Sequence, residues 1–170
     1  WIGKYVHGVE RPADLVEALD AFVAGEDDPR LITGTALGNG LPVAFVYSGN
    51  GSQWVGMGIA ADRDDDDFRA HFDQIDEIYR GIGGWSLRDA LHSDNLSERL
   101  RLTSVAQPLI FAIQSATTAA LRRRGFWSAW GGGYWVGEVA AAEAAGILDL
   151  KSAVRVIHSL STHQELVRGH

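Results

Sequence analysis

Apolar positions recur at helical spacing in several segments of the chain. Residues 12–24 have Pro12 in the first turn and Gly25 just after the last apolar position, as expected at the two ends of a helix. Residues 65–79 carry apolar side chains on one face, which also predicts a helix. The side chains of that face are Phe68, Phe72, Ile75 and Tyr79. The glycines predicted to end this helix are Gly81, Gly83 and Gly84.

The second half of the chain contains four more segments with helical patterns. Residues 87–91 form a short one, and residues 107–125 form the most regular one, with Pro108 in its predicted first turn. Residues 138–145 are rich in alanine and are followed by a glycine. Asp149 is predicted to cap a last helix. The apolar positions of this last helix are Val154, Ile157 and Leu160.

Two apolar segments are too short for helices and predict strands. They are residues 30–37 and residues 42–47, and the second is a continuous apolar run of the kind buried in a parallel sheet. Residues 38–40, which read G-N-G, interrupt the pattern and predict a boundary near residue 40. Strands that alternate with helices are typical of an α/β domain built on a parallel sheet, which is the fold class we expect.

Composition limits the classes of protein that fit this pattern. The chain has 170 residues, of which 46% are hydrophobic, so one core and a small additional element are expected. It has no cysteine, no apolar run of about 18 residues and no signal-peptide pattern at its start, which predicts a cytoplasmic protein outside the membrane. A net charge of −7 argues against nucleic acid as a partner.

Two glycine-rich turns carry the candidate chemistry. Residues 48–54 read S-G-N-G-S-Q-W and follow the predicted strand 42–47. Residues 133–138 read G-Y-W-V-G-E, which is the glycine frame of a nucleophile elbow with Trp135 at the nucleophile position. Because parallel strands end at one edge of a sheet, we expect Asn50 and Trp135 to share a crevice there, beside neighbouring parallel strands.

The motifs around these turns occur together in one known family. They are residues 43–58, with F-V-Y-S-G-N-G-S-Q-W-V-G-M-G, residues 103–112, with Q-P-L-I-F-A, and residues 136–150 after the elbow. The chain resembles the malonyl-type acyltransferase domains of type I polyketide synthases and their relatives in fatty-acid synthases. The resemblance implies that residues 41–170 are the N-terminal part of a hydrolase-like acyltransferase domain, truncated, and that residues 1–40 are part of the preceding α/β linker.

The resemblance also implies a reaction and its partners. An elbow nucleophile takes an acyl group from coenzyme A, and the phosphopantetheine arm of an acyl carrier protein accepts it, with no bound cofactor and no metal. The neighbouring ketosynthase and the rest of the synthase would be further partners. Asn50 and Val136 would supply the oxyanion N–H groups, and Gln107 would face the substrate, although its amide could equally cap a helix.

Three residues depart from the pattern of the family. Tyr134 replaces a histidine, Trp135 replaces the nucleophilic serine, and Leu160 replaces the arginine that binds the malonyl carboxylate. Indole has no nucleophilic oxygen, so the chain as written is expected to form no acyl-enzyme, and leucine cannot pair with a carboxylate. Either this is a non-catalytic acyltransferase-like scaffold that docks carrier protein, or residues 126–135 and 160 are altered in a catalytic sequence. The abrupt change among matching motifs favours alteration.

Histidines and arginines near the predicted site remain to be placed. In the family the catalytic histidine follows a ferredoxin-like insertion, and residue 170 falls where that insertion would begin. The histidines that lie too near the elbow to be that residue are His158, His163 and His170. Residues 122–124 are three arginines at a predicted helix end. Because cations stabilise the negative pole of the helix dipole, we favour a capping role for these arginines over a role in docking a partner. We also expect the chain alone to expose apolar surface.

Overall fold

The computed structural model describes the chain except for residues 1, 7–10, 36–41 and 168–170. It divides into two compact units, Trp1–Leu41 and Pro42–His170, which are described separately below. The break predicted at residues 38–40 lies outside the described residues.

The first unit is a helix beside a two-stranded sheet. Helix α1 (Pro12–Ala24) begins and ends as predicted, and Gly25 at its end has a φ of 75°, a conformation that glycine adopts without strain. Strands β1 (Ile2–Val6) and β2 (Leu31–Thr35) pair antiparallel. The predicted strand 30–37 is therefore present, although its last two residues lie outside the described part. Strand β1 was not predicted.

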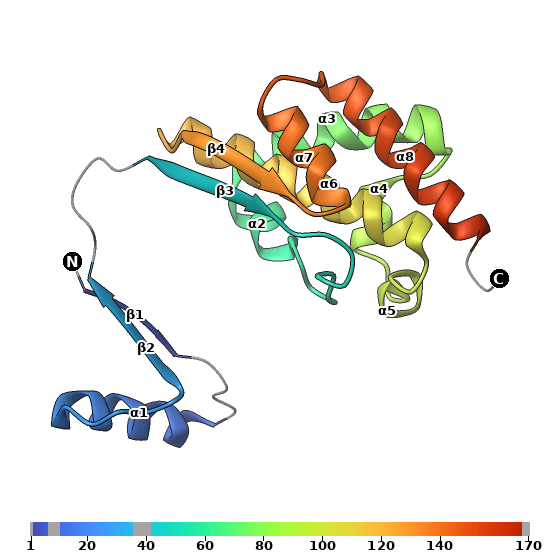
Figure 1. Cartoon of the computed structure of the whole chain (residues 1–170). Coiled ribbons are helices and arrows are strands. Elements are labelled where there is room, and N and C mark those ends of the chain that lie inside the picture. Colours follow the sequence, from blue (N-terminus) through green and yellow to red (C-terminus); the bar gives the residue numbers. More distant parts are fainter. Residues whose placement is uncertain (1, 7–10, 36–41, 168–170) are drawn as a thin grey trace. The chain divides into compact units, whose positions relative to one another are not determined.

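The second unit is built on two parallel strands. Strand β3 (Val43–Tyr47) pairs with β4 (Ser128–Gly133), and Tyr47 is opposite Gly133 at the end of the ladder. The two arrows run side by side in the same direction in Figure 1. This confirms the prediction that the strands before the two glycine turns are parallel neighbours.

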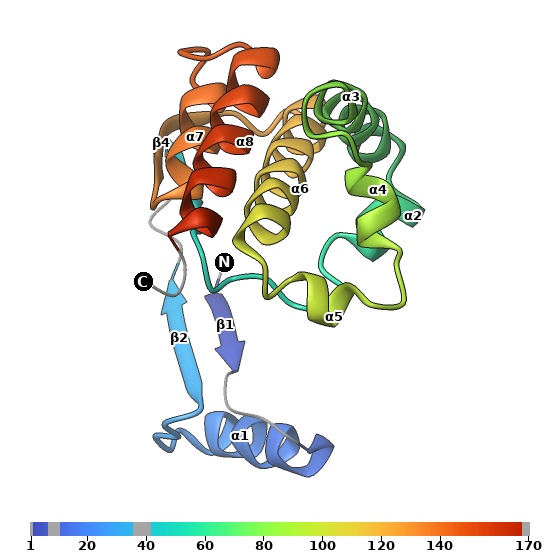
Figure 2. The ribbon, with the colours of Figure 1, turned by 90° about the vertical axis from the view of Figure 1, so that its right-hand side faces the viewer.

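Helices pack against one face of the sheet and contain most of the core. They are α2 (Ile59–Asp64), α3 (Asp66–Gly83), α4 (Leu87–Leu91), α5 (Leu96–Arg99), α6 (Thr103–Arg123), α7 (Val136–Ala144) and α8 (Leu150–Leu166). Figure 2 shows α6 between α7 and α8 on one side and α3 and α4 on the other. The long apolar stretch of α6 is buried accordingly, and with it Leu109, Phe111 and Ala116. The chain is thus an α/β protein with a parallel sheet, as predicted.

Several predicted helix ends are wrong by up to four residues. Helix α3 continues through Gly81 to Gly83, with Gly84 as its C-cap, because the buried face of the helix stabilises it beyond the cost of two glycines. Helix α6 begins at Thr103, so Pro108 lies inside it rather than in its first turn. Burial of the residues around Pro108 outweighs the one backbone hydrogen bond that proline cannot donate.

Other helix ends have local causes. Helix α7 starts two residues before Glu138, directly after the elbow, and the short helices α2 and α5 were not predicted. Asp149 caps α8 as predicted, since its Oδ1 accepts a hydrogen bond from the N–H of Ser152 at 2.7 Å. The arginines of residues 122–124 also act at helix ends: Arg122 donates to the C=O of Ala144 at the end of α7, and Arg124 to that of Ala120.

One face of the sheet is covered and the other carries exposed apolar side chains. Tyr47 is buried and its hydroxyl lies 3.1 Å from that of Thr118 on α6. On the opposite face Val46 is 81% exposed and Trp130 is 64% exposed. Adjacent exposed apolar residues of this size mark a surface that another part of a protein covers.

We predict that this face makes the isolated chain bind a hydrophobic dye and aggregate, because water contacts its apolar side chains directly. The double change Val46→Thr and Trp130→Thr places a β-branched residue at both strand positions and is expected to lower the dye fluorescence. The measurement is fluorescence of an anilinonaphthalene dye at equal protein concentration. Unchanged fluorescence in the double variant would show that the dye binds outside this face of the sheet.

Candidate active site

Trp135 occupies a backbone conformation that only a constrained turn imposes. Its φ is 53° and its ψ is −113°, and it is the only non-glycine residue with positive φ in the part of the chain that the structure describes. It lies between the end of β4 and the first residue of α7, and its side chain is 48% exposed. This is the strand-turn-helix arrangement of a nucleophile elbow, which presents one side chain at the edge of the sheet.

The glycines on both sides of Trp135 are required by close backbone contacts. A Cβ at Gly133 would overlap the backbone of Gly137, and a Cβ at Gly137 would overlap the carbonyl oxygen of Tyr47. Neither neighbour is a side chain that could move aside. The elbow therefore keeps its geometry through glycine, although no hydroxyl stands at its apex.

The first glycine turn lies directly against the elbow. The N–H of Tyr134 donates to the carbonyl oxygen of Tyr47 at 3.2 Å, which extends the strand pairing into the turn. A Cβ at Gly49 would overlap the carbonyl oxygen of Tyr134, so glycine is required here as well. The structure thus brings the turn of Asn50 and the elbow of Trp135 to the same edge of the sheet (Figure 1).

Some backbone N–H groups of the two turns have a hydrogen-bond acceptor, and others have none. The N–H of Gly51 donates to Oε1 of Gln53 at 2.9 Å, and the N–H of Gly137 donates to the C=O of Tyr134 at 3.0 Å. Among the described residues, the N–H groups of Asn50 and Val136 donate to no backbone or side-chain acceptor. These two donors are available to a ligand at the N-terminus of α7, where the helix dipole favours negative charge.

A residue that the sequence analysis missed holds the first turn in place. Nε2 of Gln114 donates to the carbonyl oxygen of Ser48 at 2.8 Å and to its hydroxyl oxygen at 2.9 Å. Gln114 lies on α6, seven residues after Gln107, and therefore on the same side of the helix. That spacing was the available signal, since polar side chains are unusual on a helix face that packs against a sheet.

Gln107 and Leu160 lie on the helices that pack around α7. Gln107 is fully buried within α6 and donates to Oε1 of Gln164 on α8, so its amide does not cap a helix end. Its own Oε1 is buried without a hydrogen-bond partner among the described residues. Leu160 is half-buried on α8 and packs against the core. Neither turn contains a hydrogen-bond partner of Gln107.

A serine, a histidine and a glutamate do meet elsewhere in the unit, but in the core. Nε2 of His71 lies 3.0 Å from Oγ of Ser115, and that hydroxyl donates to Oε2 of Glu143 at 3.0 Å. Burial lowers the pKa of His71 and raises the pKa of Glu143. Ser115 is 1% exposed and its proton is directed at the carboxylate, so no substrate can reach it and it links α3, α6 and α7 instead.

The residues that the structure describes contain no group of three or more acidic or histidine side chains placed to hold a metal ion. None of the described helices combines the length and the apolar character that crossing a bilayer requires.

The sequence profile of a known family matches this unit. Residues 44–168 match the family described as "Acyl transferase domain". The chain is 32% identical over 148 residues to the polyketide synthase GfsE of Streptomyces halstedii and 34% identical over 132 residues to the fumosorinone synthetase of Cordyceps fumosorosea. The matched segments cover 85% and 75% of this chain but only 4% and 3% of those very long proteins.

Solved structures of the same kind share the fold. The acyltransferase domain from the second module of the salinomycin polyketide synthase has a TM-score of 0.70 and 30% identity, and the match covers 97% of this chain and 38% of that one. The malonyl-CoA:ACP transacylase of Synechocystis has a TM-score of 0.62 and 30% identity, with 72% and 39% covered. The chain therefore spans well under half of these structures. It belongs to the acyl transferase domain family, in the form found in polyketide synthases.

Proposed function

We propose that residues 41–170 are the N-terminal part of a polyketide-synthase acyltransferase domain and that residues 1–40 are part of the linker before it. The reaction of the complete domain moves an acyl group of the malonyl type from coenzyme A to the phosphopantetheine arm of an acyl carrier protein. One observation carries this proposal: a nucleophile elbow, with its strained apex and two required glycines, lies against a second glycine turn that has a free N–H group. The chain would work in the cytoplasm, beside the ketosynthase and the rest of a synthase.

The two available N–H groups have the role of an oxyanion hole in this proposal. The N–H groups of Asn50 and Val136 would bind the oxygen of the thioester carbonyl as negative charge develops on it. Their fixed positions at the end of the sheet and at the start of α7 make them ready before the substrate binds. Gln107 and Leu160 would line the substrate side, and the reaction needs no metal and no bound cofactor.

The acyl-enzyme step requires an atom that this chain lacks at the elbow. In that step a hydroxyl oxygen bonds to the carbonyl carbon, the bond from carbon to sulfur breaks, and a base accepts the hydroxyl proton. Trp135 offers an indole N–H and no such oxygen. Leu160 likewise offers no donor to a malonyl carboxylate, which would be left unpaired in a buried site. We infer that the chain keeps the scaffold of the site and is inactive as written.

We predict that the chain incubated with radiolabelled malonyl coenzyme A retains no covalent label after denaturation, because no hydroxyl stands at the elbow. The measurement is label per mole of protein after acid precipitation, with a catalytic acyltransferase domain as the positive control. Stoichiometric label that survives denaturation would contradict the proposal of inactivity, and the labelled peptide would identify the residue that replaces serine.

The second candidate function is a scaffold that docks carrier protein without chemistry. The retained elbow geometry favours it, because the strained turn persists in a chain that has no use for a nucleophile. Binding of carrier protein by the unlabelled chain would support this candidate, and the coding sequence at position 135 separates the two: a serine codon restores the enzyme.

A further inference from the structure

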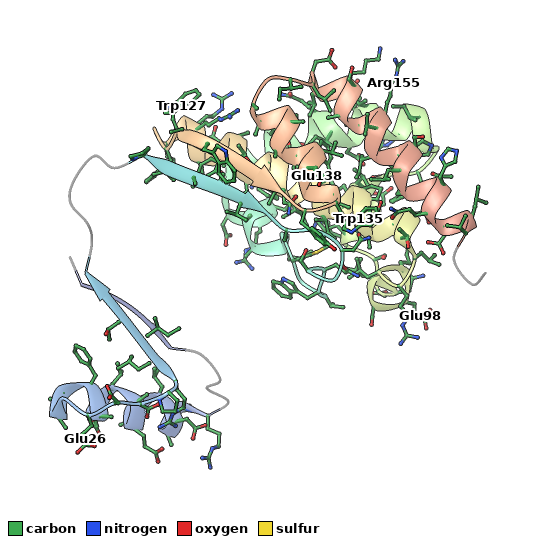
Figure 3. The ribbon with its side chains drawn as sticks, in the orientation of Figure 1. Glu26, Glu98, Trp127, Trp135, Glu138 and Arg155 are labelled. Atoms are coloured by element: carbon green, nitrogen blue, oxygen red, sulfur yellow. The ribbon has the colours of Figure 1, made fainter. Side chains whose placement is uncertain are left out.

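The two aromatic side chains that depart from the family pattern at the elbow line a recess. Tyr134, Trp135 and Glu138 line a hollow of about 410 Å³ at the start of α7. The two rings are nearly perpendicular, at 86°, and their centroids are 6.4 Å apart. Figure 3 shows Trp135 and Glu138 at this end of the unit, with Trp127 at the other end of β4.

Local structure restricts where the two rings can lie. Cδ1 of Tyr134 lies so close to Gly49 that a Cβ there would be 2.9 Å from it, and the backbone of Trp135 is fixed by the elbow. Both rings remain accessible, since Tyr134 is 65% exposed and Trp135 is 48% exposed. Accessible aromatic rings are what binding sites for quaternary ammonium groups provide.

Each ring offers accessible surface to a cation. A positive group over the face of either ring would lie inside the roughly 6 Å range of cation–π attraction. Arginines already cover two other tryptophans, Trp85 at 5.2 Å and Trp127 at 5.5 Å. No described lysine or arginine covers Tyr134 or Trp135, so these faces are available.

The charge at the recess is negative. Glu138 brings a full carboxylate charge, and within the described residues this carboxylate makes no ion pair. The N-terminus of α7 contributes about half a positive charge, which the carboxylate exceeds. The faces of aromatic rings carry negative partial charge as well.

We propose that Tyr134, Trp135 and Glu138 form a binding site for a quaternary ammonium group. The rings would bind its methyl groups through their faces, and the carboxylate of Glu138 would lie beside its charge. This site does not depend on acyl transfer, since none of its three residues needs to react.

Choline and its neutral isostere 3,3-dimethylbutan-1-ol test the proposal, because they share one shape and differ in charge. The readout is titration of the full chain by NMR, where each of the six tryptophans has its own indole N–H signal. We expect choline to bind with a dissociation constant of order millimolar, about tenfold tighter than the isostere, and to shift the Trp135 signal most.

Three variants complete the test. Glu138→Gln keeps the shape of an exposed side chain and is expected to weaken choline about fivefold while leaving the isostere unchanged. Trp135→Ser is expected to abolish binding, and Trp127→Ser, at the other end of β4, is the matched control that retains it. Equal affinity for the two probes, no binding up to about 50 mM (roughly fifty times the expected constant), or equal loss in the Trp127→Ser variant would each overturn the proposal.

Discussion

Replacing Gly133 with alanine is expected to destabilise the second unit by about 3 kcal/mol or more. The new Cβ would overlap the backbone of Gly137 at the start of α7, where nothing flexible can yield. The overlap can be relieved only if α7 moves away from β4, which would expose the core that Val136 and Ala140 help to form. The measurement is the urea midpoint of the circular dichroism signal, compared with that of the unchanged chain.

The matched control is Gly131→Ala in the same strand. A Cβ at Gly131 would lie 3.6 Å from Cε2 of Tyr47, which is an ordinary van der Waals contact. Because glycine weakens a strand interior, this change is expected to stabilise the unit by about 0.5–1 kcal/mol. If both variants lost the same stability, the cost would belong to the strand as a whole and the elbow geometry would not explain it.

The strands and turns of the site could be predicted because their signals are local. A continuous apolar run predicts β3, the glycine frame predicts the elbow, and the rule for parallel strands brings the two turns together. Strand β4 was harder, since three of its six residues are glycines that have low strand propensity. It forms because it pairs with β3, an interaction between segments that local patterns do not reveal.

The parts that could not be predicted depend on tertiary contacts. The start of α6 at Thr103 is stabilised by burial around Pro108, which overrides the preference of proline for a first turn. The spacing of Gln114 from Gln107 was its only signal in the sequence, because its contacts depend on how closely α6 approaches the end of β3. The substituted residues at the elbow were visible in the sequence, but the recess that they line was not.

Placing serine at the elbow is expected to restore almost nothing in this chain. We predict that Trp135→Ser in residues 1–170 gives at most trace transfer of malonyl groups to carrier protein, about 10²–10⁴-fold below the same change in a complete domain. A serine hydroxyl needs a base within hydrogen-bond reach, and the histidines that the structure describes have other contacts. These contacts join His71 to Ser115, His92 to Asp62, His158 to the ring of Tyr79, and His163 to the carbonyl oxygen of Ser159.

We expect Leu160 to limit the choice of acyl group independently of the base, so the assay separates the two defects. The variant Trp135→Ser with Leu160→Arg adds a guanidinium that can pair with a malonyl carboxylate, and in a complete domain it is expected to raise transfer of malonyl over acetyl groups. In residues 1–170 the same double change is expected to leave transfer at trace level, because the missing base still limits the first step. Near-full activity of the short chain would show that its general base lies within these residues, and Trp135→Ser combined with His158→Ala or His163→Ala would then identify it.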